Sequence, residues 1–322
     1  MRSDDFELLL GLLARLSVEQ KRRLEVALRS SDDEQVVVEL LEERLGASPA
    51  CVHCGQERCQ RWGFSHGLQR WRCRSCRRSF NALTGTPLAR LRKKSEWLAF
   101  ADTLSEGLSV EAAAGRCGVA RSTSFRWRHR FLRADVACSD TLGGIVEADE
   151  TFFRLSYKGS RRWRAGRTRP AGRPPKRRGT KAGRQGLTVE HVPVLVARDR
   201  QGGTRASVLE DRSSGAIDAA IGSALPDDGI LCSDSWRGFA TVATRRGIHH
   251  EPVNMSAGER CRDGIWHIQN ASAYHSRLKA WTARFKGIAT HYLPAYLAWH
   301  HILSKRIDSD GSTAWLKIAA NS

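Results

Sequence analysis

The amino-acid sequence predicts a multi-domain protein with a small N-terminal helical segment, a zinc ribbon, a helix-turn-helix and a C-terminal α/β domain. Three observations support this organisation. Two Cys-x-x-Cys pairs lie between residues 51 and 76, a basic helical pair follows them, and strands alternating with helices fill the second half. A chain of 322 residues has room for two or three such domains, since a domain typically takes about 100–200 residues.

The charge of the chain points to a polyanionic partner. Lys and Arg number 53 against 34 Asp and Glu, which gives a formal net charge of +19 and a pI near 10.2. A field of this sign and strength attracts nucleic acid, so we expect double-stranded DNA as the partner. No run approaches the roughly 18 apolar residues of a transmembrane helix, and the N-terminus lacks a basic-then-apolar signal pattern. We therefore expect a cytoplasmic, DNA-associated protein without membrane contact.

Residues 1–45 are predicted to form short amphipathic helices, because apolar residues recur there at helical spacing. Ser17 followed by Gln20, and Ser31 followed by Glu34, each fit a capping box that begins a helix. Packing against neighbouring elements or another copy of the chain is the expected role of this segment, and no catalytic function is assigned to it.

Residues 46–88 are predicted to form a zinc ribbon. The chain has nine cysteines, and an odd number cannot all pair in disulfides. Four of them occur as two Cys-x-x-Cys pairs, which is typical of metal ligands in a reducing compartment. The expected ligands of one structural Zn²⁺, two from each hairpin turn, are Cys51, Cys54, Cys73 and Cys76. His53 and Cys59 lie close enough in sequence that either could replace one of them. The arginines that surround the cysteines favour contact with the DNA backbone as well.

Residues 89–136 fit a helix-turn-helix DNA-binding domain. One helix is predicted over residues 109–117, and a second begins after the break at Gly118. The residues that we expect to project from the second helix into a major groove are Arg121, Ser122, Ser124 and Arg128. A three-helix bundle with a purely structural role would show a similar pattern.

Residues 137–322 are predicted to form an α/β catalytic domain. Their expected order is strand, strand, strand, helix, strand, helix, strand, helix, which is the order of a ribonuclease-H-like domain. The first two strands are separated by a basic insertion, residues 158–187, that is rich in Arg, Lys, Gly and Pro. Because this insertion has almost nothing to bury, we expect it to become ordered only against DNA phosphates.

Two aspartates are the expected catalytic pair of this domain. Asp149 follows the apolar run of the first strand, and Asp234 follows the later strand at residues 229–232. Adjacent parallel strands bring their carboxyl ends together, and hard carboxylate oxygens are the ligands that Mg²⁺ or Mn²⁺ prefers. Two such metals serve phosphodiester cleavage and strand transfer in this kind of domain. Glu150 could assist the pair, although strand alternation points its side chain away from Asp149. Glu147 shares the face of Asp149 and is the better neighbour, but it lies deeper.

A third metal ligand is expected from the helix after the last strand, and this helix contains neither Asp nor Glu. Ser272, His275 and Lys279 share one face of it, and Asn270 and Arg277 lie on the adjacent face. From the residues alone, the third ligand is Asn270, His275 or neither of them.

The sequence resembles the zinc-ribbon insertion-sequence transposases of the ISXO2-like DDE group over most of its length. The strings that carry the resemblance are Val146-Glu-Ala-Asp-Glu-Thr, Ser233-Asp-Ser and Tyr274-His-Ser-Arg-Leu-Lys. The resemblance makes Asp149 and Asp234 the first two catalytic acids and aligns Ser272 with the third position, where the family has Glu or Asn. It also implies Mg²⁺-dependent cleavage at the ends of a mobile element, strand transfer into target DNA, recognition of inverted repeats by the ribbon and helix-turn-helix, and backbone contacts by Arg277 and Lys279.

Two other functions remain open at this point. The missing third acid favours a catalytically decayed or domesticated DNA-binding regulator of the same family. A junction-resolving or ribonuclease-H-type nuclease would cut branched DNA or RNA–DNA hybrids without specific end sequences. For the transposase we expect a homo-oligomer assembled on DNA.

Overall fold

The computed structural model describes residues 12–13, 16–132, 140–159, 191–305 and 311–321. The chain divides into two compact units, one formed by residues 1–133 with 307–322 and the other by residues 134–306. Residues 1–11 of the predicted helical segment and nearly all of the basic insertion, residues 160–187, lie outside the described part. No helix in the described part is both long and apolar enough to cross a bilayer.

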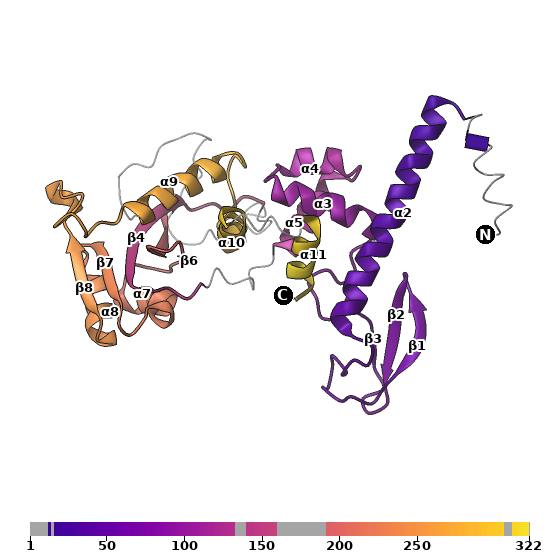
Figure 1. The fold of residues 1–322 in the computed structure, drawn as a ribbon, viewed down its shortest axis with the longest axis horizontal. Coiled ribbons are helices and arrows are strands. Elements are labelled where there is room, and N and C mark those ends of the chain that lie inside the picture. Colours follow the sequence, from indigo (N-terminus) through magenta and orange to yellow (C-terminus); the bar gives the residue numbers. More distant parts are fainter. Residues whose placement is uncertain (1–11, 14–15, 133–139, 160–190, 306–310, 322) are drawn as a thin grey trace, which may run out of the picture. The chain divides into compact units, whose positions relative to one another are not determined.

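The first unit begins with one long helix, α2 (Val18–Leu45), where several short helices are predicted (Figure 1). The side chain of Ser17 accepts the N–H of Gln20, and the side chain of Gln20 accepts the N–H of Ser17. This arrangement confirms the first predicted capping box. The second prediction is wrong, since the helix continues through Ser31 without a break.

A small antiparallel sheet follows α2. Its strands, in chain order and in spatial order, are β1 (Cys59–Ser65), β2 (Leu68–Cys73) and β3 (Ser79–Phe80). The turn between β1 and β2 consists of His66 and Gly67, both with positive φ (52° and 78°), as a tight two-residue hairpin turn requires. The core of this sheet is small and is formed by Trp71 and Phe80 together with cysteine side chains.

Three α-helices complete the sequence-contiguous part of the unit. They are preceded by a short 3-10 turn, and the four elements are η1 (Lys94–Glu96), α3 (Trp97–Ser105), α4 (Val110–Arg116) and α5 (Arg121–Phe131). Ser109 caps α4 by accepting the N–H of Ala112. Phe100 of α3 packs edge-on against Trp127 and Phe131 of α5, with ring centroids 5.3 and 5.4 Å apart. The aromatic contacts bury the faces along which α3 and α5 meet.

The last helix, α11 (Gly311–Asn321), belongs to the first unit, although the sequence predicts one continuous domain over residues 137–322. Trp315 donates its indole N–H to the hydroxyl of Ser105 in α3 over 2.9 Å. Trp315 and Leu316 are buried. The apolar face of α11 is therefore covered by α3, and the chain returns to the unit in which it began.

The second unit contains a mixed sheet of five strands. In chain order they are β4 (Ile145–Arg154), β5 (His191–Asp199), β6 (Thr204–Val208), β7 (Ile230–Asp234) and β8 (His249–Val253). The spatial order is β6-β5-β4-β7-β8, with antiparallel pairing from β6 to β4 and parallel pairing from β4 to β8. The predicted hairpin of β5 and β6 and the predicted order of strands and helices are both observed.

Helices cover both faces of this sheet (Figure 1). The helical elements are α7 (Ser214–Ile221), η2 (Gly222–Ala224), α8 (Arg237–Arg246), η3 (Met255–Ala257), α9 (Gln269–Ala283), η4 (Thr290–Tyr292) and α10 (Leu293–Ser304). Val146 and Ala148 of β4 face the buried cluster that includes Ile217 and Phe239 of α7 and α8. The intervening residues of β4 face α9, because successive side chains of a strand alternate between its faces.

Candidate active site

The two predicted catalytic aspartates meet at the middle of the five-stranded sheet. Asp234 is the last residue of β7, and the parallel pairing of Ala148 with Ser233 places Asp149 level with it on the neighbouring strand. Asp149 is not at a strand end as predicted, because β4 continues to Arg154 along its antiparallel partner β5. The edge of the pocket is formed instead by the end of β7.

A third carboxylate reaches the same pocket. Single oxygen atoms of Asp149, Glu150 and Asp234 all lie within 4.8 Å of one another. Strand alternation sends the Glu150 side chain to the opposite face of β4, but β7 has ended at this level and leaves room for both side chains to approach Asp234. Such a group of oxygen atoms is suited to a hard divalent cation.

The pocket disfavours negative charge. Burial raises the pKa of Asp234, and the neighbouring Asp149 carboxylate raises it further. The N–H of Trp236, which donates to Asp234 Oδ1 over 3.1 Å, has the opposite effect, which is smaller than that of burial. Burial also raises the pKa of Glu150, against the opposing effect of Arg212. A cation entering the pocket would relieve this repulsion and favour the ionised carboxylates.

Helix α9 closes the third side of the pocket. The hydroxyl of Ser272 donates to Asp149 Oδ2 over 3.3 Å, and Nδ1 of His275 lies 3.5 Å from the same oxygen. His275 is buried, and its Nε2 has no hydrogen-bond partner in the described part of the chain. Arg277 and Lys279, proposed to hold DNA, are both exposed on the same helix. The structure thus brings Ser272 and His275 to the aspartate pair.

Asn270 does not reach this pocket, because it binds Glu147. Its backbone N–H and its side-chain amide donate to the two oxygens of Glu147 over 2.7 and 2.8 Å, and the N–H of Ala271 donates over 3.3 Å. Arg200 Nε and His267 Nδ1 lie 2.9 and 3.3 Å from the same carboxylate, which is fully buried. Glu147 therefore fastens the first turn of α9 to β4, two residues before Asp149.

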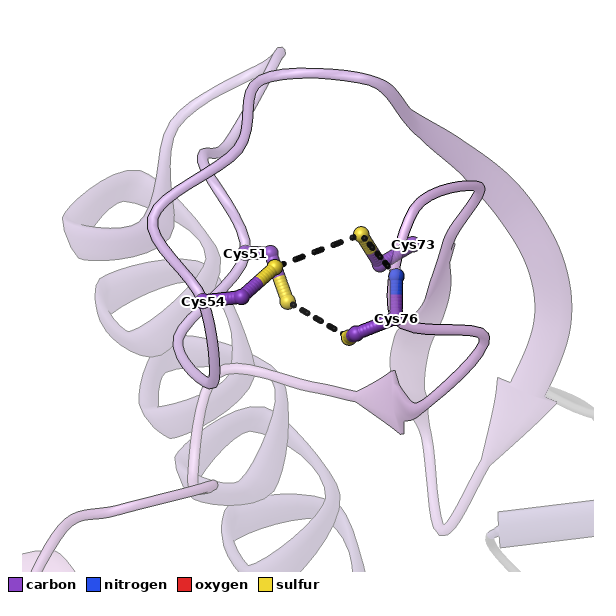
Figure 2. Close-up of side chains that lie close together, drawn as sticks. All are labelled: Cys51, Cys54, Cys73 and Cys76. Atoms are coloured by element: carbon purple, nitrogen blue, oxygen red, sulfur yellow. Dashed lines mark hydrogen bonds between the residues drawn. The ribbon is translucent and has the colours of Figure 1, made fainter.

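The four predicted zinc ligands also meet (Figure 2). The Sγ atoms of Cys51 and Cys76 are 3.6 Å apart, those of Cys54 and Cys73 are 3.7 Å apart, and all four lie within 4.8 Å of one another. Four thiolates at about 2.3 Å from a tetrahedral Zn²⁺ are about 3.8 Å apart, so the group has the size of a zinc site. His53 and Cys59 are not part of it.

The backbone around the cysteines favours thiolates. The N–H of Cys76 donates to Cys73 Sγ and is the largest of the causes that together lower the pKa of Cys73 to about 6. In Cys54 the N–H of Gln56 acts in the same direction, but burial and the neighbouring cysteine side chains raise the pKa to about 12. In both Cys-x-x-Cys turns the residue after the second cysteine has a positive φ, 74° at Gly55 and 59° at Arg77. The two turns therefore have the same shape and present their sulfur atoms to a common centre.

The predicted DNA-reading face of α5 needs correction at two positions. Ser124 and Arg128 are buried, and they donate to the carbonyls of Val110 and Leu108 over 3.0 and 2.6 Å. Both side chains hold α5 to the α3–α4 region and cannot enter a groove. Arg121 and Ser122 are exposed, as predicted.

The sequence did not indicate Arg212, nor that Glu150 approaches both aspartates although it leaves β4 on the other face. Arg212 lies between β6 and α7, far from both aspartates in sequence, and no motif identifies it. The approach of Glu150 depends on the level at which the parallel pairing of β4 with β7 ends.

Residues 141–299 match the ISXO2-like transposase domain, and residues 89–139 match a homeodomain-like helix-turn-helix domain. An uncharacterised protein in transposable element ISH50 of Halobacterium salinarum is 26% identical over 250 residues, which are 77% of this chain and 82% of the relative. Two solved structures, a Mos1 strand transfer complex and a pre-cleavage Mos1 transpososome, share 14% and 15% identity. Each alignment covers 66% of this chain and 78% of the other, and TM-scores of 0.23 and 0.22 carry no conclusion. Through residues 141–299 the chain belongs to the family of proteins with an ISXO2-like transposase domain.

Proposed function

We propose that this protein is an insertion-sequence transposase that cuts the ends of its mobile element and joins them to target DNA. The supporting observation is the pocket in which Asp149 and Asp234 lie level on adjacent parallel strands, with Ser272 and His275 closing it from α9. The sheet order and the helices on both faces are also those that we expect of a ribonuclease-H-like domain.

Mg²⁺ or Mn²⁺ held by Asp149 and Asp234 would activate the attacking oxygen and stabilise the leaving one. In the first step a water oxygen attacks phosphorus at the element end, the bond from phosphorus to the 3′ oxygen breaks, and that oxygen takes up a proton. In the second step the freed 3′-hydroxyl attacks a target phosphate and loses its proton, and the bond from that phosphorus to the target's own 3′ oxygen breaks as this oxygen takes up a proton. The residues of the pocket orient the phosphate for both steps.

DNA binding is proposed for the first unit and for α9. The exposed face of α5 with Arg121 and Ser122 would read the inverted repeats, and Arg277 and Lys279 would hold backbone phosphates near the pocket. Cys51, Cys54, Cys73 and Cys76 would bind one Zn²⁺ and stabilise a ribbon that has little core of its own. We further propose that copies of the chain assemble on the two ends of the element. The protein would do so in the cytoplasm, where it meets chromosomal DNA.

A cleavage assay tests the central proposal. The substrate is a duplex with the inverted repeats that flank the gene, incubated with the full chain and Mg²⁺ or Mn²⁺, and nicks are mapped on a sequencing gel. We expect nicks at the repeat ends that disappear in Asp149→Ala and Asp234→Ala. Asp218→Ala is the matched control and should cut normally, since Asp218 lies in α7 and pairs with Arg246 of α8 instead of with the residues around Asp149 and Asp234.

One observation favours a second function, a DNA-binding regulator that has lost its chemistry. Ser272, whose hydroxyl is a weaker metal ligand than a carboxylate, occupies the third side of the pocket. For a regulator, the same duplex would bind with sequence preference but would stay intact with either metal. That result would overturn the transposase proposal.

A further inference from the structure

Arg212 is held beside the catalytic aspartates by Glu150, whose carboxylate pairs with Arg212 alone among the residues that the structure describes. Its Nε donates to Glu150 Oε1 over 3.1 Å, and its Nη2 donates to Glu150 Oε2 over 3.0 Å. The side chain of Glu150 is only 1% exposed, so its carboxylate is almost wholly withdrawn from water. Both oxygens of Glu150 are therefore engaged by one planar guanidinium, the geometry that fixes an arginine most firmly.

Aromatic contacts fix the same side chain from a second direction. The guanidinium carbon lies 4.4 Å from the ring centroid of Trp236 and 5.8 Å from that of Phe152. The indole N–H of Trp236 also donates to the backbone carbonyl of Arg212 over 3.1 Å. The side chain and the backbone of Arg212 are thus both oriented before any substrate arrives.

One edge of the guanidinium remains available. Arginine has five N–H donors in a planar fork, and Glu150 uses the edge formed by Nε and Nη2. The other edge is formed by Nη1 and Nη2. Nη2 lies 3.8 Å from Asp234 Oδ2, and Nη1 donates to no residue in the ranges that the structure describes. The side chain of Arg212 is 22% exposed, so it is not sealed from solvent.

We propose that Arg212 is a catalytic residue whose free edge binds a non-bridging oxygen of the DNA phosphate at Asp149 and Asp234, and that Glu150 is the positioning residue that aims it. This inference rests on the function proposed above. Phosphoryl transfer places charge on the non-bridging oxygens in the transition state, and a preoriented guanidinium stabilises that charge without rearrangement. It also offsets the repulsion between three carboxylates and an incoming phosphate.

The alternative role for Glu150 is that of the third metal ligand, which its distance from Asp149 and Asp234 would allow. That role requires Glu150 to release Arg212, because a carboxylate that accepts two guanidinium N–H groups has given up its best ligand directions. The two roles predict different behaviour, since a ligand acts through metal affinity and a positioning residue acts through Arg212.

The first experiment measures single-turnover cleavage of the inverted-repeat duplex at saturating protein. Arg212→Lys keeps the charge but loses the fork, and we expect the rate to fall by about a hundredfold or more, as when one transition-state donor is removed elsewhere. Arg212→Ala should fall further and recover in part with added methylguanidinium. Arg246→Lys, a change to an arginine that pairs with Asp218 on the surface, is the control and should keep the wild-type rate. Thermal unfolding checks that each variant is folded.

The second experiment has a readout other than activity. DNA binding is measured by fluorescence anisotropy in Ca²⁺, with the duplex either unmodified or carrying a neutral methylphosphonate at the cleaved phosphate. If Arg212 contacts that phosphate, the modification weakens binding by the wild type several-fold but has little further effect in Arg212→Ala, which has no charge to pair with the phosphate. Glu150→Gln should reproduce the cleavage defect of Arg212→Lys while leaving Mn²⁺ affinity, measured by electron paramagnetic resonance, unchanged.

The outcomes separate the two proposals. A wild-type protein that leaves the duplex intact overturns the transposase function itself. A wild type that cuts, together with an Arg212→Lys variant that cuts equally fast or an Arg212→Ala variant that stays fully sensitive to the methylphosphonate, overturns only the role of Arg212. A several-fold loss of Mn²⁺ affinity in Glu150→Gln would make Glu150 a metal ligand and refute its positioning role.

Discussion

Replacing Glu147 tests whether the first turn of α9 depends on this one buried carboxylate. In Glu147→Ala the N–H groups of Asn270 and Ala271 lose their acceptor, and each buried donor without a partner costs about 1–3 kcal/mol. Arg200, with a side chain 30% exposed, can turn to water and adds little. We therefore expect a loss of about 3–5 kcal/mol, in the range for removing one partner of a buried ion pair. Glu147→Gln keeps one acceptor oxygen and should cost about half as much.

Hydrogen exchange followed by mass spectrometry is the appropriate assay, because it reports peptides of β4 and α9 separately from the first unit. Asp218→Ala removes a carboxylate that pairs with half-exposed arginines, and it should cost at most about 1 kcal/mol. Protection of β4 and α9 in Glu147→Ala within about 1 kcal/mol of the wild type would refute the reasoning, since it would mean that the helix needs no anchor there.

Three further predictions concern other parts of the chain. Cys73→Ser should abolish the binding of one zinc per chain, measured with a colorimetric chelator, and should expose residues 51–80 to protease; full zinc content in the variant would contradict this. Burial, with Arg277 as a smaller cause, lowers the pKa of His300 to about 4 from 6.5. Between pH 6.5 and 4 this histidine is protonated in the unfolded chain but neutral in the folded chain, so the free energy of unfolding should fall as pH drops through this range. At pH 5 the loss from this group is about 2 kcal/mol. His300→Phe should remove that part of the slope in urea titrations, and an unchanged slope would contradict it. Arg128→Ala should lower the melting temperature of the first unit, because Arg128 is buried. Arg121→Ala should leave the melting temperature unchanged, because Arg121 is exposed, and should reduce the salt dependence of DNA binding by about one phosphate contact. The reverse pattern would mean that Arg128 belongs to the DNA-reading face after all.

The parts of the fold that the sequence predicts correctly depend on local chemistry. The spacing of Cys51, Cys54, Cys73 and Cys76 specifies a four-sulfur centre, because two tight turns can present their thiols in few other ways. The Ser17 capping box is predictable for the same reason.

The errors arise where tertiary packing decides. Ser124 and Arg128 lie on a helix whose buried side depends on where α3 and α4 pack, and the sequence of α5 alone does not specify that side. The site shows the same limit. Asp149 and Asp234 follow apolar strand patterns and could be found, but Asn270 is diverted by Glu147, a residue 123 positions away along the chain. The convergence of Arg212 on Glu150 likewise depends on the level at which β7 ends.

The position of α11 has a genetic consequence. A premature stop codon just after residue 306 would leave every residue of the catalytic pocket encoded, yet it would remove the helix that covers α3 through Trp315. The first effect of such a mutation should be loss of a stable DNA-binding unit. Deletion of codons 307–322 would then cause a DNA-binding defect, although the segment expected to contact DNA is encoded before residue 133.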